Sequence, residues 1–210
     1  EFHAVYHRVL ELCTTDLSAI YLDASKDTMY CDGPTSPERR SAQTAMYHVL
    51  RGITTVIAPI LSFTADEIYE AMPGEKKASV HLDEIPKMEP LLSADEAASW
   101  AQLLKLREAV MPVLEKARAA KQIGQSLEAD VAIAGRVPET GVDLAKFFIV
   151  SHADVTPSDA ETADVSWAPA RGKKCGRCWQ YREEVAEDGD LCTRCQEVVD
   201  TLAPTELPTA

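Results

Sequence analysis

Cys175-Gly-Arg-Cys178 and Cys192-Thr-Arg-Cys195 lie near the end of this 210-residue chain, with thirteen residues between them. Two Cys-x-x-Cys knuckles on one short segment can place four thiolates at the corners of a tetrahedron, the geometry of closed structural zinc sites. We therefore predict one structural Zn²⁺ ion held by Cys175, Cys178, Cys192 and Cys195. Such sites contribute on the order of 10–16 kcal/mol, so the segment should fold only when metal is bound.

The same cysteine pattern is compatible with other chemistries. Iron in a rubredoxin-like site has the same tetrahedral sulfur geometry. Two redox dithiols or two disulfides are further alternatives, and six cysteines would suit a small secreted disulfide framework. However, Cys13 and Cys31 lie far upstream in hydrophobic surroundings. This distribution favours zinc plus two ordinary thiols in a cytoplasmic protein.

The first knuckle carries the only strongly positive patch of the chain. The net charge is −13, which argues against non-specific nucleic-acid binding by the chain as a whole. Residues 171–182, in contrast, hold five basic and no acidic side chains. An unpaired base stacked on an aromatic ring gains about 1–3 kcal/mol, and stacking is favoured beside cations. The predicted RNA-binding residues of this patch are Lys173, Lys174, Arg177, Trp179, Tyr181 and Arg182.

A purely structural explanation of these residues stays open. Four thiolates around Zn²⁺ leave an excess of negative charge. The cations near the knuckles, Lys173, Lys174, Arg177 and Arg194, would then serve to neutralise it. Trp179 would pack under the metal as a small core instead of displaying its ring. In that case the module would clamp the chain without touching RNA.

The first part of the chain predicts a helical bundle. Residues 2–20 have apolar side chains at spacings of three and four, whereas residues 25–36 are rich in turn formers. Ser36 is a predicted N-cap, because Pro37 follows at the first helical position. Thr64-Ala-Asp-Glu67 fits a capping box that would start a short helix ending near Met72.

The middle of the chain predicts an α+β unit. Ser93-Ala-Asp-Glu96 is a second capping box, followed by a helix that Pro112 should bend. The alternation over residues 127–133 and the apolar run Phe147-Phe-Ile-Val150 each predict a strand. Residues 151–166 are acidic and are expected to form a linker or an edge segment.

Catalytic and membrane motifs are missing from the sequence. It contains no Gly-rich phosphate loop and no Gly-x-Ser-x-Gly, and its five histidines are scattered. No apolar run reaches the length of a membrane span. The chain opens at Glu1-Phe2 inside an apolar-periodic segment, which suggests a piece excised from a longer protein.

Several stretches resemble, in order, the C-terminal part of class I isoleucyl-tRNA synthetases. The family's helical anticodon-binding domain, its junction and its zinc module are matched by Glu38–Thr44, Ala58–Ile68, Leu106–Val110, Leu114–Arg118, Ile123–Ala129, Phe148–Ser151, Lys174–Trp179 and Leu191–Cys195. One departure is Thr28, which stands where the family often has Arg. The resemblance implies a mainly α fold with a helical anticodon-binding bundle (1–86), a small α+β junction domain (87–166) and a zinc-ribbon-like four-cysteine module with its tail (167–210).

The resemblance also implies a function. The parent enzyme attaches isoleucine to tRNA(Ile) with ATP and Mg²⁺ and hydrolyses mischarged valyl-tRNA. The family's His-Ile-Gly-His and Lys-Met-Ser-Lys-Ser motifs are absent here, so we predict a tRNA-binding piece that has no catalytic site. We expect it to be a monomer that binds neither a membrane nor DNA. By resemblance, Arg177 and Trp179 lie near the anticodon, and Arg39 and Arg40 also contact RNA. The alternatives are a DNA-binding zinc module of the formamidopyrimidine-DNA glycosylase type and a structural appendage.

Overall fold

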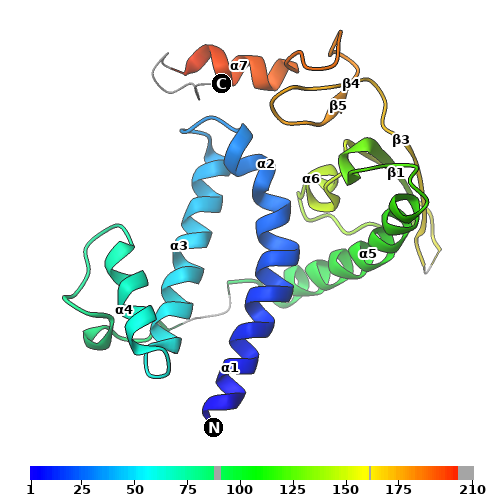
Figure 1. The fold of residues 1–210 in the computed structure, drawn as a ribbon. Helices are drawn as coiled ribbons and strands as arrows, with labels where there is room; N and C mark the ends of the chain where they lie inside the picture. Colours follow the sequence, from blue (N-terminus) through cyan, green and yellow to red (C-terminus); the bar gives the residue numbers. More distant parts are fainter. Residues whose placement is uncertain (88–90, 161, 203–210) are drawn as a thin grey trace. The chain divides into compact units, whose positions relative to one another are not determined.

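The structure is a computed structural model that describes residues 1–87, 91–160 and 162–202 (Figure 1). The chain divides into two compact units: a helical unit, Glu1–Asp23 with Pro34–Pro90, and a C-terminal unit, Ala24–Gly33 with Leu91–Ala210. Residues 24–33 thus belong to the C-terminal unit, although their sequence neighbours on both sides do not. The three-part division at residues 86 and 166 stays a prediction, and the predicted tail lies outside the described residues.

The first helical stretch comprises α1 (Phe2–Glu11), a π-helix (Leu12–Leu22) and α2 (Asp23–Cys31). The predicted helix over residues 2–20 is confirmed. The expectation of turn residues from 25 onward is wrong for residues 25–31, which are helical. Asp, Ser and Thr lower helix propensity only weakly, and tertiary contacts of α2 outweigh that preference.

The helical unit is built around α3 (Pro37–Ile57) and α4 (Ser62–Ala71), with a 3₁₀ turn at Val80–Leu82. The Ser36 cap is confirmed, since its Oγ accepts a 3.1 Å hydrogen bond from the Arg39 N–H. The capping box at Thr64 is wrong, because the helix already begins at Ser62. The buried core of this unit consists of Ala58, Ala65, Tyr69, Met72 and Val80.

A partly buried polar network borders that core. The Tyr69 hydroxyl donates to Oδ2 of Asp83 over 2.8 Å, and Arg51 pairs with the same oxygen at 3.1 Å. The hydrogen bond from Tyr69 holds the pKa of Asp83 below its ordinary value, with further help from the Glu84 N–H and from Arg51. The network joins α3, α4 and the segment after Val80–Leu82.

In the C-terminal unit, α5 (Ala94–Ala119) begins with the predicted capping box. Ser93 Oγ accepts from the Glu96 N–H, and the Glu96 carboxylate accepts from the Ser93 N–H. Pro112 lies inside α5 without ending it. The helix ends at Ala119, and Lys121 adopts a left-handed conformation with φ of 56°.

The sheet of this unit has the order β2-β1-β3, in which β1 (Ala129–Ala134) is parallel to β2 (His152–Thr156) and antiparallel to β3 (Asp164–Pro169). The strand expected at Phe147–Val150 is wrong. Phe147 and Phe148 are buried at the end of α6 (Leu144–Phe148) instead. The acidic stretch 151–166 contributes the edge strand β2 and the start of β3, so the edge-segment alternative is confirmed for its described residues.

The chain ends in a short hairpin, β4 (Lys173–Lys174) with β5 (Tyr181–Arg182), and in α7 (Thr193–Thr201). The predicted fold class, mainly helical with a small sheet and a C-terminal cysteine module, is confirmed (Figure 1). Among the described residues, no helix combines the length and apolar character that crossing a bilayer requires.

Candidate metal centre and nucleic-acid interface

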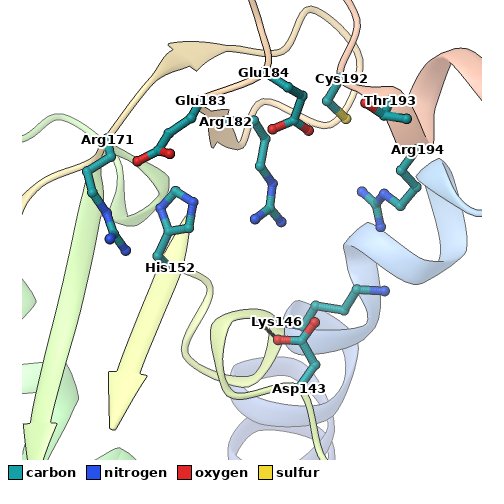
Figure 2. Close-up of a pocket in the computed structure, with 10 residues that line it drawn as sticks. All are labelled: Asp143, Lys146, His152, Arg171, Arg182, Glu183, Glu184, Cys192, Thr193 and Arg194. Carbon is teal, nitrogen blue, oxygen red and sulfur yellow. Dashed lines mark hydrogen bonds between the residues drawn. The ribbon is translucent and has the colours of Figure 1, made fainter. Parts of the chain in front are cut away.

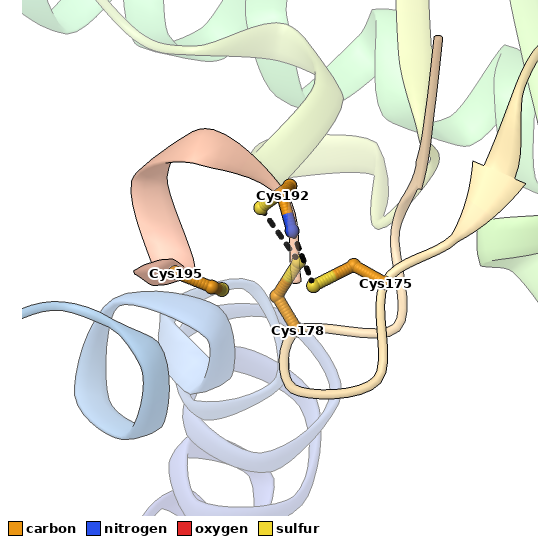
Figure 3. A group of neighbouring side chains, drawn as sticks. All are labelled: Cys175, Cys178, Cys192 and Cys195. Carbon is orange, nitrogen blue, oxygen red and sulfur yellow. Dashed lines mark hydrogen bonds between the residues drawn. The ribbon is translucent and has the colours of Figure 1, made fainter. Parts of the chain in front are cut away.

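The two knuckles bring their four cysteines into one buried cluster (Figure 3). The Sγ atoms of Cys175, Cys178, Cys192 and Cys195 all lie within 4.8 Å of one another. The Sγ atoms of Cys178 and Cys192 are 3.8 Å apart, far longer than a disulfide bond, and all six cysteines are free. Zn–S bonds of about 2.3 Å place tetrahedral sulfurs roughly 3.8 Å apart. The donor set therefore fits Zn²⁺.

Backbone hydrogen bonds hold the knuckles in this geometry. The Cys192 N–H donates to Cys175 Sγ over 3.3 Å, and the Gly176 N–H donates to the Asp190 carbonyl over 3.0 Å. A Cβ at Gly176 would lie 2.2 Å from the carbonyl oxygen of Gly189. Only glycine allows this close approach of the two loops.

Little apolar surface supports this module. The buried cluster around the four sulfurs adds only Cys31 and Val185, with Leu191 packed against it. A metal-bound set of thiolates must therefore replace the core that an ordinary domain of this size would bury. Cys31 is a fifth buried thiol at this cluster, and burial raises its pKa to about 12.

Arg177 and Arg194 occupy the same place in the two knuckles, immediately before the second cysteine of each. Both side chains reach α2. Arg177 donates to the carbonyl oxygens of Tyr30, over 3.3 Å, and Cys31. Arg194 binds both carboxylate oxygens of Asp27, over 2.6 and 2.7 Å. We call Arg177 and Arg194 the arginine clamp.

The Arg194 side of the clamp is an ion-pair network. Arg194 also pairs with Asp32 at 3.2 Å, and Lys146 Nζ lies 3.4 Å from Asp27 and 3.6 Å from Asp32. Burial raises the pKa of Asp27, but the hydrogen bond and charge of Arg194, together with Lys146, outweigh it, so the pKa lies below its ordinary value. The bond to Asp27 in turn raises the pKa of Arg194. Arg194 thus anchors α2.

Trp179 follows the first knuckle and is displayed to solvent. Trp179 is 55% exposed, so its indole does not pack under the metal as the structural alternative supposed. The backbone is left-handed, with φ of 65°, a conformation that costs a non-glycine residue roughly 1–2 kcal/mol. Lys174 Nζ lies 5.6 Å from the ring centroid, within the range of a cation–π contact. Strained residues of this kind are concentrated at functional sites.

A family model described as the anticodon-binding domain of tRNA ligase matches residues 1–133. The chain belongs to this family. A second family model, described as a zinc finger found in FPG and IleRS, matches residues 172–198. These residues include both cysteine knuckles and the β4–β5 hairpin, whose loop contains the first knuckle.

Curated relatives named isoleucine–tRNA ligase are similar over nearly the whole chain. The protein of Syntrophotalea carbinolica is 41% identical over 219 residues, and that of Desulforamulus reducens is 40% identical over 221 residues, each covering 95% of this chain. The protein of Natranaerobius thermophilus is 35% identical over 223 residues and covers 96% of it. The chain spans 24% of the length of each of these relatives.

The remaining predicted RNA contacts of the knuckle lie on two faces of the β4–β5 hairpin. Lys174 is paired with Tyr181, and Lys173 with Arg182. Paired residues share a face and successive residues alternate, so the hairpin presents Lys174 and Tyr181 on one side and Lys173 and Arg182 on the other. Tyr181 is half-buried, and its N–H donates to Ser151 Oγ over 2.7 Å. Lys174, on the first of these sides, lies over the ring of Trp179.

The other face borders a pocket of about 590 Å³ (Figure 2). Arg171 binds Asp130 at 2.7 Å, and His152 Nδ1 lies 2.7 Å from the other oxygen of that carboxylate. Arg182 points into the pocket (Figure 2). Its side chain donates to the side-chain oxygen of Gln180. The lining mixes both signs of charge and consists of Asp143, Lys146, His152, Arg171, Arg182, Glu183, Glu184, Cys192, Thr193 and Arg194. Their pairs with Asp130 favour a structural role for Arg171 and His152.

Arg39 and Arg40 belong to the helical unit, in the first turn of α3. Arg39 is half-buried, whereas Arg40 is exposed. Their contact with RNA stays a prediction. The sequence alone did not reveal the partners of the clamp, Asp27 and Asp32, because they lie more than 160 residues before Arg194. The sequence predicted only turn residues over 25–36, and nothing in it connects this segment with the knuckles.

Proposed function

We propose that this chain is the tRNA anticodon-recognition part of an isoleucine–tRNA ligase. The match to anticodon-binding domains, the zinc-finger match and the isoleucine–tRNA ligase relatives support this function. The observation that carries it is the exposed, left-handed Trp179 on a cysteine knuckle beside Lys174. An aromatic face next to a cation is the arrangement on which unpaired nucleotides stack.

In this proposal the metal has a structural role. Cys175, Cys178, Cys192 and Cys195 hold one Zn²⁺ ion, and a site with four protein ligands leaves no position for a reacting water. The ion joins the two knuckles and so fixes the backbone on which Trp179 stands. The arginine clamp then connects this unit with α2.

The RNA surface extends over both faces of the hairpin. Lys174 and Trp179 make the central contact, and Lys173, Tyr181 and Arg182 bind neighbouring phosphates or bases. Arg177 supports the surface through α2, because its Nη1 and Nη2 donate to carbonyl oxygens of that helix. Arg39 and Arg40 add contacts from the helical unit.

We extend the proposal to the complete enzyme, with the relatives named isoleucine–tRNA ligase as its support. The complete enzyme attaches isoleucine to tRNA(Ile) with ATP and Mg²⁺, edits valine, and acts as a monomer in the cytoplasm. The ATP and Mg²⁺ sites belong to its catalytic domain, whose motifs this sequence lacks. We propose that this chain contributes three parts to the enzyme: the helical bundle (1–86), the junction domain (87–166) and the zinc module with its tail (167–210).

Titration of Trp179→Ala with tRNA(Ile) tests the proposal. Loss of one stacked base should raise the Kd by on the order of 5- to 100-fold, which lies within the range of about 1–3 kcal/mol that base stacking contributes. Zinc content should stay unchanged, and Trp179→Phe should recover most of the affinity. Excess duplex DNA should not compete with tRNA. Equal tRNA affinity of the parent chain and Trp179→Ala would refute the role of this residue.

A further inference from the structure

Tyr30 is a second exposed aromatic residue of the C-terminal unit. It lies in the last turn of α2 and is 77% exposed, more than Trp179. Single exposed aromatic residues are common on protein surfaces, but a tyrosine ring offers a large face to a ligand when its backbone is fixed beside a binding site. Neither the cysteine pattern nor the basic patch had drawn attention to this residue.

The backbone of Tyr30 is fixed next to the first knuckle. Its carbonyl oxygen accepts a hydrogen bond from Arg177 Nη2 over 3.3 Å, and the next carbonyl, of Cys31, accepts from Nη1 of the same side chain. Cys31 is itself buried in the cysteine cluster. Arg177 stands two positions before Trp179 in sequence. One guanidinium group therefore connects the backbones that carry the two exposed aromatic rings.

The charges around Tyr30 permit an anionic ligand. Asp27 and Asp32 flank it in sequence and would repel phosphate if their charges were uncompensated. Both carboxylates are instead bound by Arg194 and Lys146. The nearby negative charge is thus balanced inside the protein, and the ring remains accessible.

We propose that Tyr30 is a second base-stacking residue of the RNA surface, supplied by α2 rather than by the knuckle and set in place relative to Trp179 by the arginine clamp. The inference rests on the proposed function, since RNA is the ligand in both. A ring on a fixed backbone gains stacking energy at a small loss of side-chain entropy. Two platforms from separate segments would hold successive or splayed bases of a loop.

The test compares tRNA(Ile) binding by the zinc-loaded parent chain and by Tyr30→Ala, Tyr30→Phe and Trp179→Ala. Tyr30→Ala should raise the Kd by on the order of 5- to 100-fold, whereas Tyr30→Phe should stay within about twofold of the parent chain, because stacking needs only the ring. Phe2→Ala is the matched control, since Phe2 is 72% exposed, close to the 77% of Tyr30. Zinc content and the folded spectrum are measured for every variant.

The outcomes separate this inference from the function on which it rests. If Tyr30→Ala binds like the parent chain while Trp179→Ala binds weakly, Tyr30 has no stacking role and the proposed function stands. If both variants bind like the parent chain, both proposals fail. If Tyr30→Phe is as weak as Tyr30→Ala, the hydroxyl group makes the contact and the stacking inference is overturned.

Discussion

The helical unit and the zinc module, residues 172–202, are stabilised in different ways. In the helical unit, α3 and α4 bury an apolar cluster that includes Ala65 and Tyr69, both less than 4% exposed. The zinc module buries four cysteines and little else that is apolar. Thiolate–metal bonds therefore have to supply the stability that burial of apolar surface provides in the helical unit.

Each region also contains a partly buried arginine–aspartate pair, but the two pairs have different tasks. Arg51 and Asp83 complete a core that is already apolar. Arg194 and Asp27 connect the zinc module with α2, next to the buried contact that Cys31 of α2 makes with the cysteine cluster. The comparison teaches that a metal knuckle can leave its aromatic residues exposed for binding, since its own fold does not need them.

Removal of a thiolate should have the largest effect. Cys175→Ser should abolish high-affinity metal binding, whose free energy is on the order of 10–16 kcal/mol, and the zinc module should unfold. The helical unit should keep its folded signals, because its core contains none of the cysteines. Metal analysis together with amide NMR spectra checks both statements. Persistence of folded knuckle signals in the metal-free variant would show that the module has a core of its own.

Removal of the clamp should have a smaller effect. Arg194→Met leaves Asp27 without its bidentate partner and should lower the stability of the zinc module by about 1–3 kcal/mol. Arg8→Met is the control, because Arg8 pairs with Glu11 at 2.9 Å and its side chain is 83% exposed. An exposed pair contributes roughly 0–1 kcal/mol. Unfolding measured at constant free zinc gives the change in unfolding free energy for both variants. Equal changes for Arg194→Met and Arg8→Met would show that the clamp does not stabilise the zinc module.

Acid should separate the two regions at different pH values. The folded pKa of Asp83 is lowered, so its contribution is fully present above its unfolded pKa of about 3.9 and is lost as the pH falls through the folded value. As the pH falls, the zinc module should unfold before the helical unit does, since protonation of its thiolates releases the metal. A pH titration that follows zinc release and the helical-unit amides tests this order. In Asp83→Asn the acid-dependent loss in the helical unit should shrink; simultaneous loss in both regions would contradict the prediction.

Local signals were sufficient for the parts of the fold that depend on neighbouring residues. The Ser36 cap, the Ser93–Glu96 capping box and the two cysteine knuckles are all readable within a few residues of sequence. Each corresponds to a short-range hydrogen-bond pattern or ligand spacing. The matching helix starts and the cysteine cluster were therefore predictable.

The errors occurred where distant contacts decide the conformation. Residues 25–31 have turn-like composition, yet they are helical and are held by Arg177 and Arg194 from the other end of the chain. Phe147 and Phe148 resemble a buried strand, but the Asp143 cap and their burial produce a short helix. The exposure of Trp179 and Tyr30 likewise depends on tertiary structure, which residue spacing does not reveal.

The central claim is that the zinc-bound knuckle displays Trp179 to a nucleotide of tRNA. The most direct measurement is the tRNA(Ile) affinity of the parent chain and of Trp179→Ala, each with zinc bound and after metal removal. We predict that the substitution weakens binding on the order of 5- to 100-fold when zinc is present and has little effect when it is absent. An equal effect of the substitution with and without zinc, or no effect in the zinc-bound chain, would contradict the account.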